Sequence, residues 1–223
     1  MKLRTRLAAA AASAALVAGA GLAAAPSASA NSDTTILSVV NSVDRYTSTE
    51  KDGLDRFRWD QRNWYDFDIL TAAVVADGTL VEAVTAASTA VTLFAPNDRA
   101  FQLLAKDLTG NWYWTEQAVL NAIVGAVGDG SGQVNLTNVL TYHVVDGKFL
   151  KADVVPLIGS PIGTLNEGNS FTVQAPNRFG FIEIDDEVDG FRNPYLVRTD
   201  IDAGNSVIHS ISRVLIPADV INP

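Results

Sequence analysis

The hydrophobic pattern of this chain changes character once, near residue 142, and this change limits the fold more than any other feature. Before it, apolar residues recur at helical intervals, as Ile36, Val39 and Val43 do. After it, short apolar runs are separated by Gly, Pro, Asn and Asp at turn-like spacing. Helices followed by strands, instead of a strict alternation of the two, are typical of an α+β domain with an antiparallel sheet.

The same pattern places the individual elements. Helices are expected over 35–43, from Asp66 or Asp68 to about Asp77, over 79–84, after Pro96-Asn97-Asp98, and over 116–127. Strands are expected over 91–94, 143–145, 170–175, 179–184, 195–199 and 211–216. No internal repeat or long linker divides residues 31–223, so we expect them to form one domain.

Residues 1–30 have the layout of a secretory signal peptide. Lys2, Arg4 and Arg6 make a basic start, an alanine-rich apolar stretch follows, and Ala28-Ser29-Ala30 provides small residues for cleavage. A transmembrane anchor is the alternative, but an alanine-dominated stretch is only weakly hydrophobic. We therefore expect a secreted mature chain that begins near Asn31 and has no stable membrane insertion.

The charge and the absence of cysteine exclude several functions. The formal net charge is −9, and the removal of three basic residues with the signal peptide makes the mature chain more acidic still. Such a surface repels nucleic acid, because binding there depends on the neutralisation of phosphates by Lys and Arg. With no cysteine, the chain has no disulfides, no thiolate nucleophile and no Cys-ligated zinc.

Three segments resemble the signatures of one family, and they occur in that family's order. TLFAPNDRAF (92–101), LTYHVVDGKF (140–149) and NSVIHSISRVLIP (205–217) are similar to the first, central and closing signatures of the fasciclin (FAS1) domain. The resemblance extends over about residues 34–217. It implies N-terminal helices packed on a wedge, or sandwich, of two small β-sheets, and a role in adhesion and extracellular interaction. The signature residues are Pro96, Asn97, Asp98, Phe101 and His209.

Two segments depart from the family pattern and contain all four tryptophans. Residues 44–66 include Trp59 and Trp64, and residues 108–115 include Trp112 and Trp114. We interpret these insertions as packing on each other in a secondary core. The alternative is an exposed aromatic face, since indole rings suit contacts with a protein partner or a saccharide. All four tryptophans are therefore candidate partner-binding residues.

The two histidines are the first candidates for chemistry, and both lie in apolar runs. Neither His143 nor His209 belongs to an H-E-x-x-H motif, and the sequence has no G-x-S-x-G nucleophile elbow. Buried histidines are usually satisfied by neighbouring polar groups, so we predict structural roles, with no catalytic residue, no cofactor and no metal. His209 is expected to fix the closing strand to Asn97-Asp98. The family resemblance makes Tyr142 and His143 candidate receptor contacts, although their apolar neighbours favour packing.

The segment DDEVDG (185–190) nearly matches a calcium-binding loop. Asp185, Glu187 and Asp189 occupy the first, third and fifth ligand positions, but the twelfth position is Leu196 instead of a bidentate Glu. We interpret the segment as a solvated acidic hairpin.

Together these observations predict a secreted, non-catalytic interaction or adhesion module. Its partner would be an extracellular protein or a cell-envelope component, with a saccharide as a further possibility. The alternative is a carrier for a small apolar or saccharide ligand beside the aromatic insertions. A carrier should enclose a pocket lined by tryptophans, whereas an adhesive module should present them on an open surface.

Overall fold

The computed structural model describes residues 36–43, 64–77, 90–127, 136–186 and 188–217. Its helices are α1 (Ile36–Val43), α2 (Asp68–Asp77), α4 (Asp98–Thr109), α5 (Glu116–Val127), α6 (Leu136–Tyr142) and α7 (Lys151–Val154), which continues into a 3-10 turn, η2 (Val155–Leu157). Its strands are β1 (Val91–Pro96), β2 (Val144–Asp146), β3 (Pro161–Gly163), β4 (Ser170–Gln174), β5 (Glu183–Asp185), β6 (Leu196–Ala203) and β7 (Ser206–Ile211).

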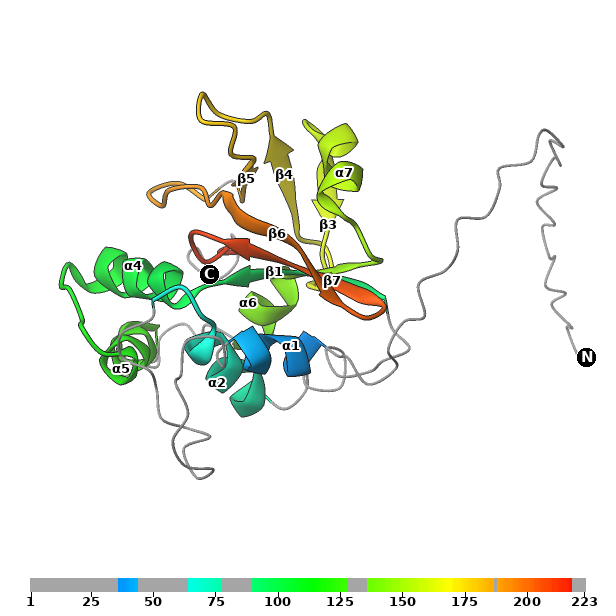
Figure 1. Cartoon of the computed structure of the whole chain (residues 1–223). Helices are drawn as coiled ribbons and strands as arrows, with labels where there is room; N and C mark the ends of the chain where they lie inside the picture. Colours follow the sequence, from blue (N-terminus) through cyan, green and yellow to red (C-terminus); the bar gives the residue numbers. More distant parts are fainter. Residues whose placement is uncertain (1–35, 44–63, 78–89, 128–135, 187, 218–223) are drawn as a thin grey trace, which may run out of the picture.

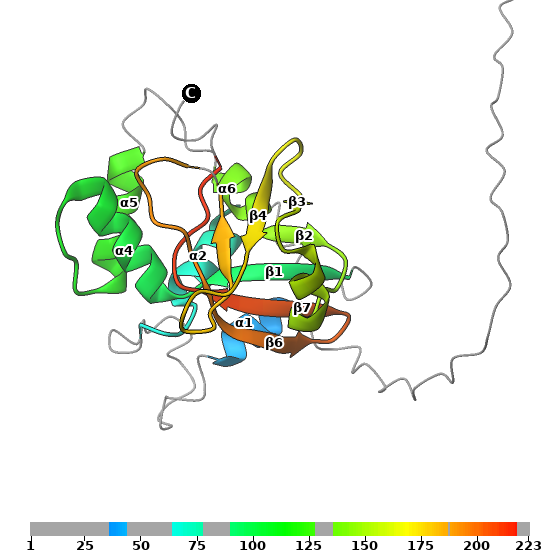
Figure 2. The same cartoon turned by 90° about the horizontal axis from the view of Figure 1, so that it is seen from above.

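The strands form two sheets, and the four-stranded sheet occupies the middle of the fold. Its order is β2-β1-β7-β6, and the second sheet has the order β3-β4-β5. Helices α1 and α2 lie on one side of the four-stranded sheet and the three-stranded sheet lies on the other, while α4 and α5 lie together at one end (Figures 1 and 2). This is the expected α+β arrangement of helices packed on two small sheets.

Strand β1 is buried along its whole length because both of its faces are covered. Val91, Leu93 and Ala95 belong to the core on the helix side, whereas Phe94 belongs to the core between the two sheets. Successive side chains of a strand point to opposite faces, so a nearly continuous apolar run suits a central strand of this kind. The two cores therefore meet across β1.

The largest error in the predicted topology concerns the central strand pair. Strands β1 and β7 are parallel, from Thr92 opposite Val207 to Pro96 opposite Ile211, so the sheet is mixed instead of antiparallel. Parallel pairing needs a long crossover, and here the crossover contains most of the domain. Pattern within one segment carries no information about the direction of a partner more than a hundred residues away.

Several element boundaries also differ from the prediction. The closing strand is β7 and ends at Ile211, so the apolar run 211–216 mostly follows the strand, although Val214, Leu215 and Ile216 are buried. Helix α6, helix α7 and the short strand β3 were not predicted. The helix expected over 79–84 lies outside the described residues.

Candidate functional site

His143 is buried and both of its ring nitrogens contact the backbone. Nδ1 lies 2.7 Å from the carbonyl oxygen of Val139, and Nε2 accepts a hydrogen bond from the Leu215 amide at 2.9 Å. Nδ1 therefore carries the proton. Burial lowers the pKa of His143 to about 4, although the Val139 carbonyl raises it. The neutral ring joins α6 to the segment after β7, and neither nitrogen remains for proton transfer or metal binding.

His209 is also buried, but the predicted partner is wrong. Its Nε2 lies 2.8 Å from the carbonyl oxygen of Phe149, and its Nδ1 accepts from the Asp200 amide at 3.2 Å. Burial lowers the pKa of this histidine too, against the raising effects of the Phe149 carbonyl and of Asp200. The segment carrying Asn97 is instead joined to β7 through the backbone, because the Asn97 amide donates to the Ile211 carbonyl.

Tyr142, the other candidate receptor contact, lies inside the protein as well. Its hydroxyl donates to the carbonyl oxygen of Ser170 at 2.9 Å, and its ring packs edge-on against Phe171. Tyr142 thus joins the end of α6 to β4 in the second sheet. Neither Tyr142 nor His143 is available to a partner at the surface.

The tryptophans of the two insertions have different environments. Trp64 is half-buried and packs against the helix-side core, while its carbonyl oxygen accepts a hydrogen bond from the Arg99 amide. Trp59 lies outside the described residues. Trp112 and Trp114 have exposed fractions of 39% and 72%. The predicted secondary core is therefore wrong for the two tryptophans of 108–115, and Trp64 packs against the main core.

Trp112 and Trp114 form an aromatic platform together with Arg99 and Lys106 of α4. The two indole rings are stacked, with centroids 6.3 Å apart and planes 25° apart. The Arg99 guanidinium and the Lys106 ammonium lie 4.9 Å and 5.3 Å from the Trp112 ring centre, which is the geometry of cation–π contacts. The platform is a cationic and aromatic surface on an otherwise acidic protein.

The loop that carries the platform is anchored to the rest of the protein by a hydrogen bond and by packing against the helix-side core. The side-chain amide of buried Gln102 donates to the Tyr113 carbonyl at 2.6 Å, and Tyr113 packs against the helix-side core. Helix α4 ends at Gly110, whose φ of 75° suits glycine and whose amide donates to the Lys106 carbonyl. The sequence Trp-Tyr-Trp thus places its central ring inward and its outer rings outward.

A second group of exposed aromatic side chains was not expected from the sequence. Phe179, Phe181 and Tyr195 are all exposed, and the rings of Phe181 and Tyr195 lie 6.0 Å apart. The Arg178 guanidinium lies 4.6 Å from the centre of the Phe179 ring. Single exposed aromatic residues are common. The contact between Phe181 and Tyr195 joins two chain segments, and the sequence pattern does not predict such a contact.

The acidic segment 185–190 is not a wholly solvated hairpin. Asp186 is buried, and its Oδ2 accepts a hydrogen bond from the Ile216 amide at 3.0 Å. Burial raises the pKa of Asp186, against the lowering effect of its backbone hydrogen bonds. Asp186 therefore anchors the segment after β7, while Asp189 is exposed.

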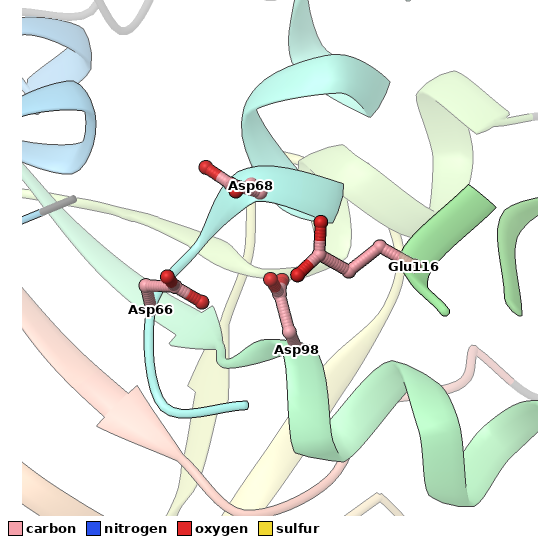
Figure 3. A group of neighbouring side chains, drawn as sticks. All are labelled: Asp66, Asp68, Asp98 and Glu116. Carbon is pink, nitrogen blue, oxygen red and sulfur yellow. The ribbon is translucent and has the colours of Figure 1, made fainter. Parts of the chain in front are cut away.

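Four carboxylates from separate parts of the chain meet beside the helix-side core. Asp66, Asp68, Asp98 and Glu116 each bring one oxygen into a group in which all these atoms lie within 4.8 Å of one another. Asp98 and Glu116 point toward one another, and Asp66 comes from the segment before α2 (Figure 3). We call this group the carboxylate cluster. Asp68 is half-buried and the other three are buried.

Local hydrogen bonds explain how the carboxylate cluster is assembled. The Asp98 amide donates to the Asp66 carbonyl at 3.0 Å, and Asp98 Oδ1 accepts from the Ile69 amide in the first turn of α2. Asp68, Asp98 and Glu116 are the first residues of α2, α4 and α5, and acidic residues are favourable at helix N-termini. From the sequence, Asp66 and Asp68 were expected at the start of a helix and Asp98 was expected as a signature residue at another. Their meeting with each other and with Glu116 was not expected, because it depends on how three helices pack.

The cluster has an unusual electrostatic state. The pKa of Asp98 is raised to about 7. Burial is the main cause and the negative charges of Glu116 and Asp68 add to it, whereas hydrogen bonds with Asp66 and Ile69 act in the opposite direction. A contact between two carboxyl groups requires a shared proton, since an ionised carboxylate has no donor. The raised pKa of Asp98 favours its protonated form near neutral pH.

Comparisons with known proteins agree with the fold. The model of the Fasciclin domain matches residues 66–217. The uncharacterized protein sll1735 of Synechocystis sp. is 31% identical over 146 residues, which cover 62% of this chain and 87% of that protein. Within the described residues, no helix has the length and apolar character needed to cross a membrane.

A similar solved structure is the FAS1 domain pair from the insect cell adhesion molecule Fasciclin I. It aligns with a TM-score of 0.51 at 17% sequence identity, over 72% of this chain. The chain spans half the length of that pair. The match of the family model over most of the chain, together with the two-sheet fold, shows that this protein belongs to the fasciclin domain family.

Proposed function

We propose that the protein is a secreted, non-catalytic interaction module that binds an extracellular or cell-envelope partner through the aromatic platform. The observation that carries this proposal is the exposed, stacked pair of Trp112 and Trp114 beside two cationic side chains. Tryptophan and arginine are enriched among the residues that dominate binding energy at protein interfaces. Fasciclin I, whose domains have the same fold, is a cell adhesion molecule.

The charge distribution restricts the partner. The protein has a net charge of −9, yet Arg99 and Lys106 lie against the same indole ring. A partner with acidic groups beside an apolar patch complements such a surface. The platform also suits the face of a saccharide, because sugar rings stack on indoles.

The carrier hypothesis is less well supported by the described residues. Trp112 and Trp114 lie on an open surface instead of around an enclosed cavity. A hollow beside α4 is lined by residues that include Leu104, Asp107 and Arg213 but no tryptophan. An enzymatic function is not proposed, since both ring nitrogens of each histidine are engaged with the backbone.

The test compares platform variants with a matched aromatic control. Trp114→Ala and Trp112→Ala should weaken the binding of the purified protein to isolated cell envelopes and to immobilised envelope polysaccharide. The loss should be about tenfold or more for at least one of them, which is the scale of an interface hot spot. The stability of Trp114→Ala should change by only about 0.5 kcal/mol, because the side chain is largely exposed.

Phe181→Ala is the control, since it removes an exposed aromatic ring from the other group. This variant should bind as the wild type does. Equal binding by wild type and both tryptophan variants would contradict the proposal, and so would a loss of binding confined to Phe181→Ala. Binding of the wild-type protein to purified envelope polysaccharide, without other envelope components, would identify the saccharide as the partner.

A further inference from the structure

We propose that the carboxylate cluster of Asp66, Asp68, Asp98 and Glu116 binds one calcium ion. This proposal does not rest on the proposed partner-binding function. It differs from the acidic segment 185–190, which only resembles a calcium loop in sequence. It also departs from the expectation, based on sequence, that the chain holds no metal.

The spacing of the carboxylate oxygens suits calcium. One oxygen from each of the four residues lies within 4.8 Å of the others. Calcium–oxygen distances are about 2.3–2.6 Å, so ligands on opposite sides of the ion are separated by about twice that distance. The four oxygens can therefore surround one ion without a large movement of the backbone that carries them.

Burial of the cluster favours a bound cation. Three of the four carboxylates are buried, and burial strongly disfavours negative charge. The negative charges of Glu116 and Asp68 act on Asp98 in the same direction as burial does. The N-termini of α2, α4 and α5 each contribute roughly half a positive charge, and a divalent cation would stabilise the carboxylates further.

A separate observation concerns the second oxygen of Asp98. Asp98 is fully buried, and Oδ1 accepts from the Ile69 amide, but no N–H or hydroxyl of the described residues donates to Oδ2. Figure 3 shows this carboxylate directed into the cluster, toward Glu116. Buried acceptors normally have a partner. A calcium ion at the centre of the cluster would be a partner for this oxygen.

The ligand chemistry favours calcium over other metals. The donors are all carboxylate oxygens, whereas zinc and copper sites in proteins rely on histidine and cysteine. Magnesium requires near-ideal octahedral geometry at shorter distances and tends to keep several waters. Calcium accepts six to eight oxygens in flexible arrangements, which suits four carboxylates from separate segments. Asp68 is half-buried, so the group is not wholly closed to solvent.

The position of the site links the core to the platform. Asp98 and Arg99 are adjacent at the start of α4, and Glu116 follows Trp114 by two residues. A cation bound to Asp98 and Glu116 would tie together both ends of the segment that carries Trp112 and Trp114. Calcium would then stabilise the platform without contacting the partner.

The first experiment measures calcium binding by the wild-type protein after metal removal with EDTA and dialysis. Isothermal titration with CaCl2 should give one site, and calcium should raise the melting temperature, because a ligand that binds only the folded state stabilises it. Terbium, excited through Trp64 and other indoles, should luminesce and be displaced by calcium. Absence of calcium binding, or an equal effect of MgCl2 at the same concentration, would overturn the assignment.

Substitutions in the cluster and in the acidic segment 185–190 then test where the ion binds. Glu116→Gln and Asp68→Asn should each bind calcium at least about tenfold more weakly, because affinity follows the number and charge of the ligands. Asp189→Asn, in the acidic segment 185–190, should bind calcium as the wild type does.

The variant results can contradict the proposal in two ways. Wild-type affinity in both cluster variants would show that the ion is not in the cluster, and loss of binding in Asp189→Asn alone would place it in the acidic segment. If Glu116→Gln does not fold, Asp68→Asn decides, because its side chain is partly exposed. Loss of partner binding in the platform variants is independent of all these outcomes.

Discussion

At the scale of single residues, the polar groups of the core are defined by backbone contacts far away in the sequence. His143 contacts Val139 and Leu215, and His209 contacts Phe149 and Asp200. An apolar run around a histidine predicts its burial, because the neighbours are buried on the same element. The partner depends on which segment packs against the ring, and this is why the expected link from His209 to Asn97-Asp98 was wrong.

We predict that His143 makes folding stability depend on pH below neutrality. Its pKa is lowered to about 4 in the folded protein, from 6.5 in the unfolded chain. Its contribution is therefore fully present above pH 6.5 and is lost as the pH falls toward 4, by up to about 1.4 kcal/mol per pH unit. His143→Ala should flatten this part of the profile in urea unfolding measured at several pH values.

The same variant should also be less stable at pH 7. It leaves the Val139 carbonyl and the Leu215 amide without their partner, which costs about 1–3 kcal/mol. The raised pKa of Asp186 affects wild type and variant alike, so it cancels in the difference between them. Parallel pH profiles for the two proteins would contradict the assigned role of His143.

At the scale of elements, local sequence signals predict where helices begin, but they do not predict which strands pair or in which direction. Pro96-Asn97-Asp98 correctly predicted the start of α4, where Asn97 has extended backbone and its side chain accepts from the Ala100 amide at 3.0 Å. This cap forms between residues three apart. The direction of β7 beside β1 depends instead on the path of the whole intervening chain, which explains why the mixed sheet was missed.

We predict that Asn97→Ala lowers the free energy of unfolding by about 0.5–2 kcal/mol, because it removes the N-cap of α4. Asn97→Ser should retain most of that stability, since serine also caps helices. Thermal or urea unfolding of the two variants gives the comparison. An equal loss in both would indicate that packing of the buried side chain, and not the cap, is responsible.

At the scale of the whole molecule, two cores share one central sheet. The helix-side core and the core between the sheets meet across β1 and β7, and every residue of both strands is buried. The segment after β7 closes the structure, because Leu215 and Ile216 donate to His143 and Asp186. The C-terminal end of the family match thus belongs to the folded unit.

A prediction for the whole molecule concerns export. We predict that the protein is exported and that the mature chain begins at or near Asn31, because Ala28-Ser29-Ala30 has the small side chains that signal peptidase requires. Mass spectrometry of the culture supernatant measures this directly. A protein retained in the membrane with residues 1–30 intact would contradict secretion as a soluble domain.

The α+β class, the order of most elements and the family could be predicted without coordinates, because these depend on periodicity and on contiguous signatures. The remaining features depend on tertiary packing. It placed Trp64 against the core and Trp112 on the surface, and it brought Glu116 to Asp66 and Asp98. Such groupings arise from the packing of helices and strands that lie far apart in the chain. No local pattern of residues records which distant segment will become a neighbour.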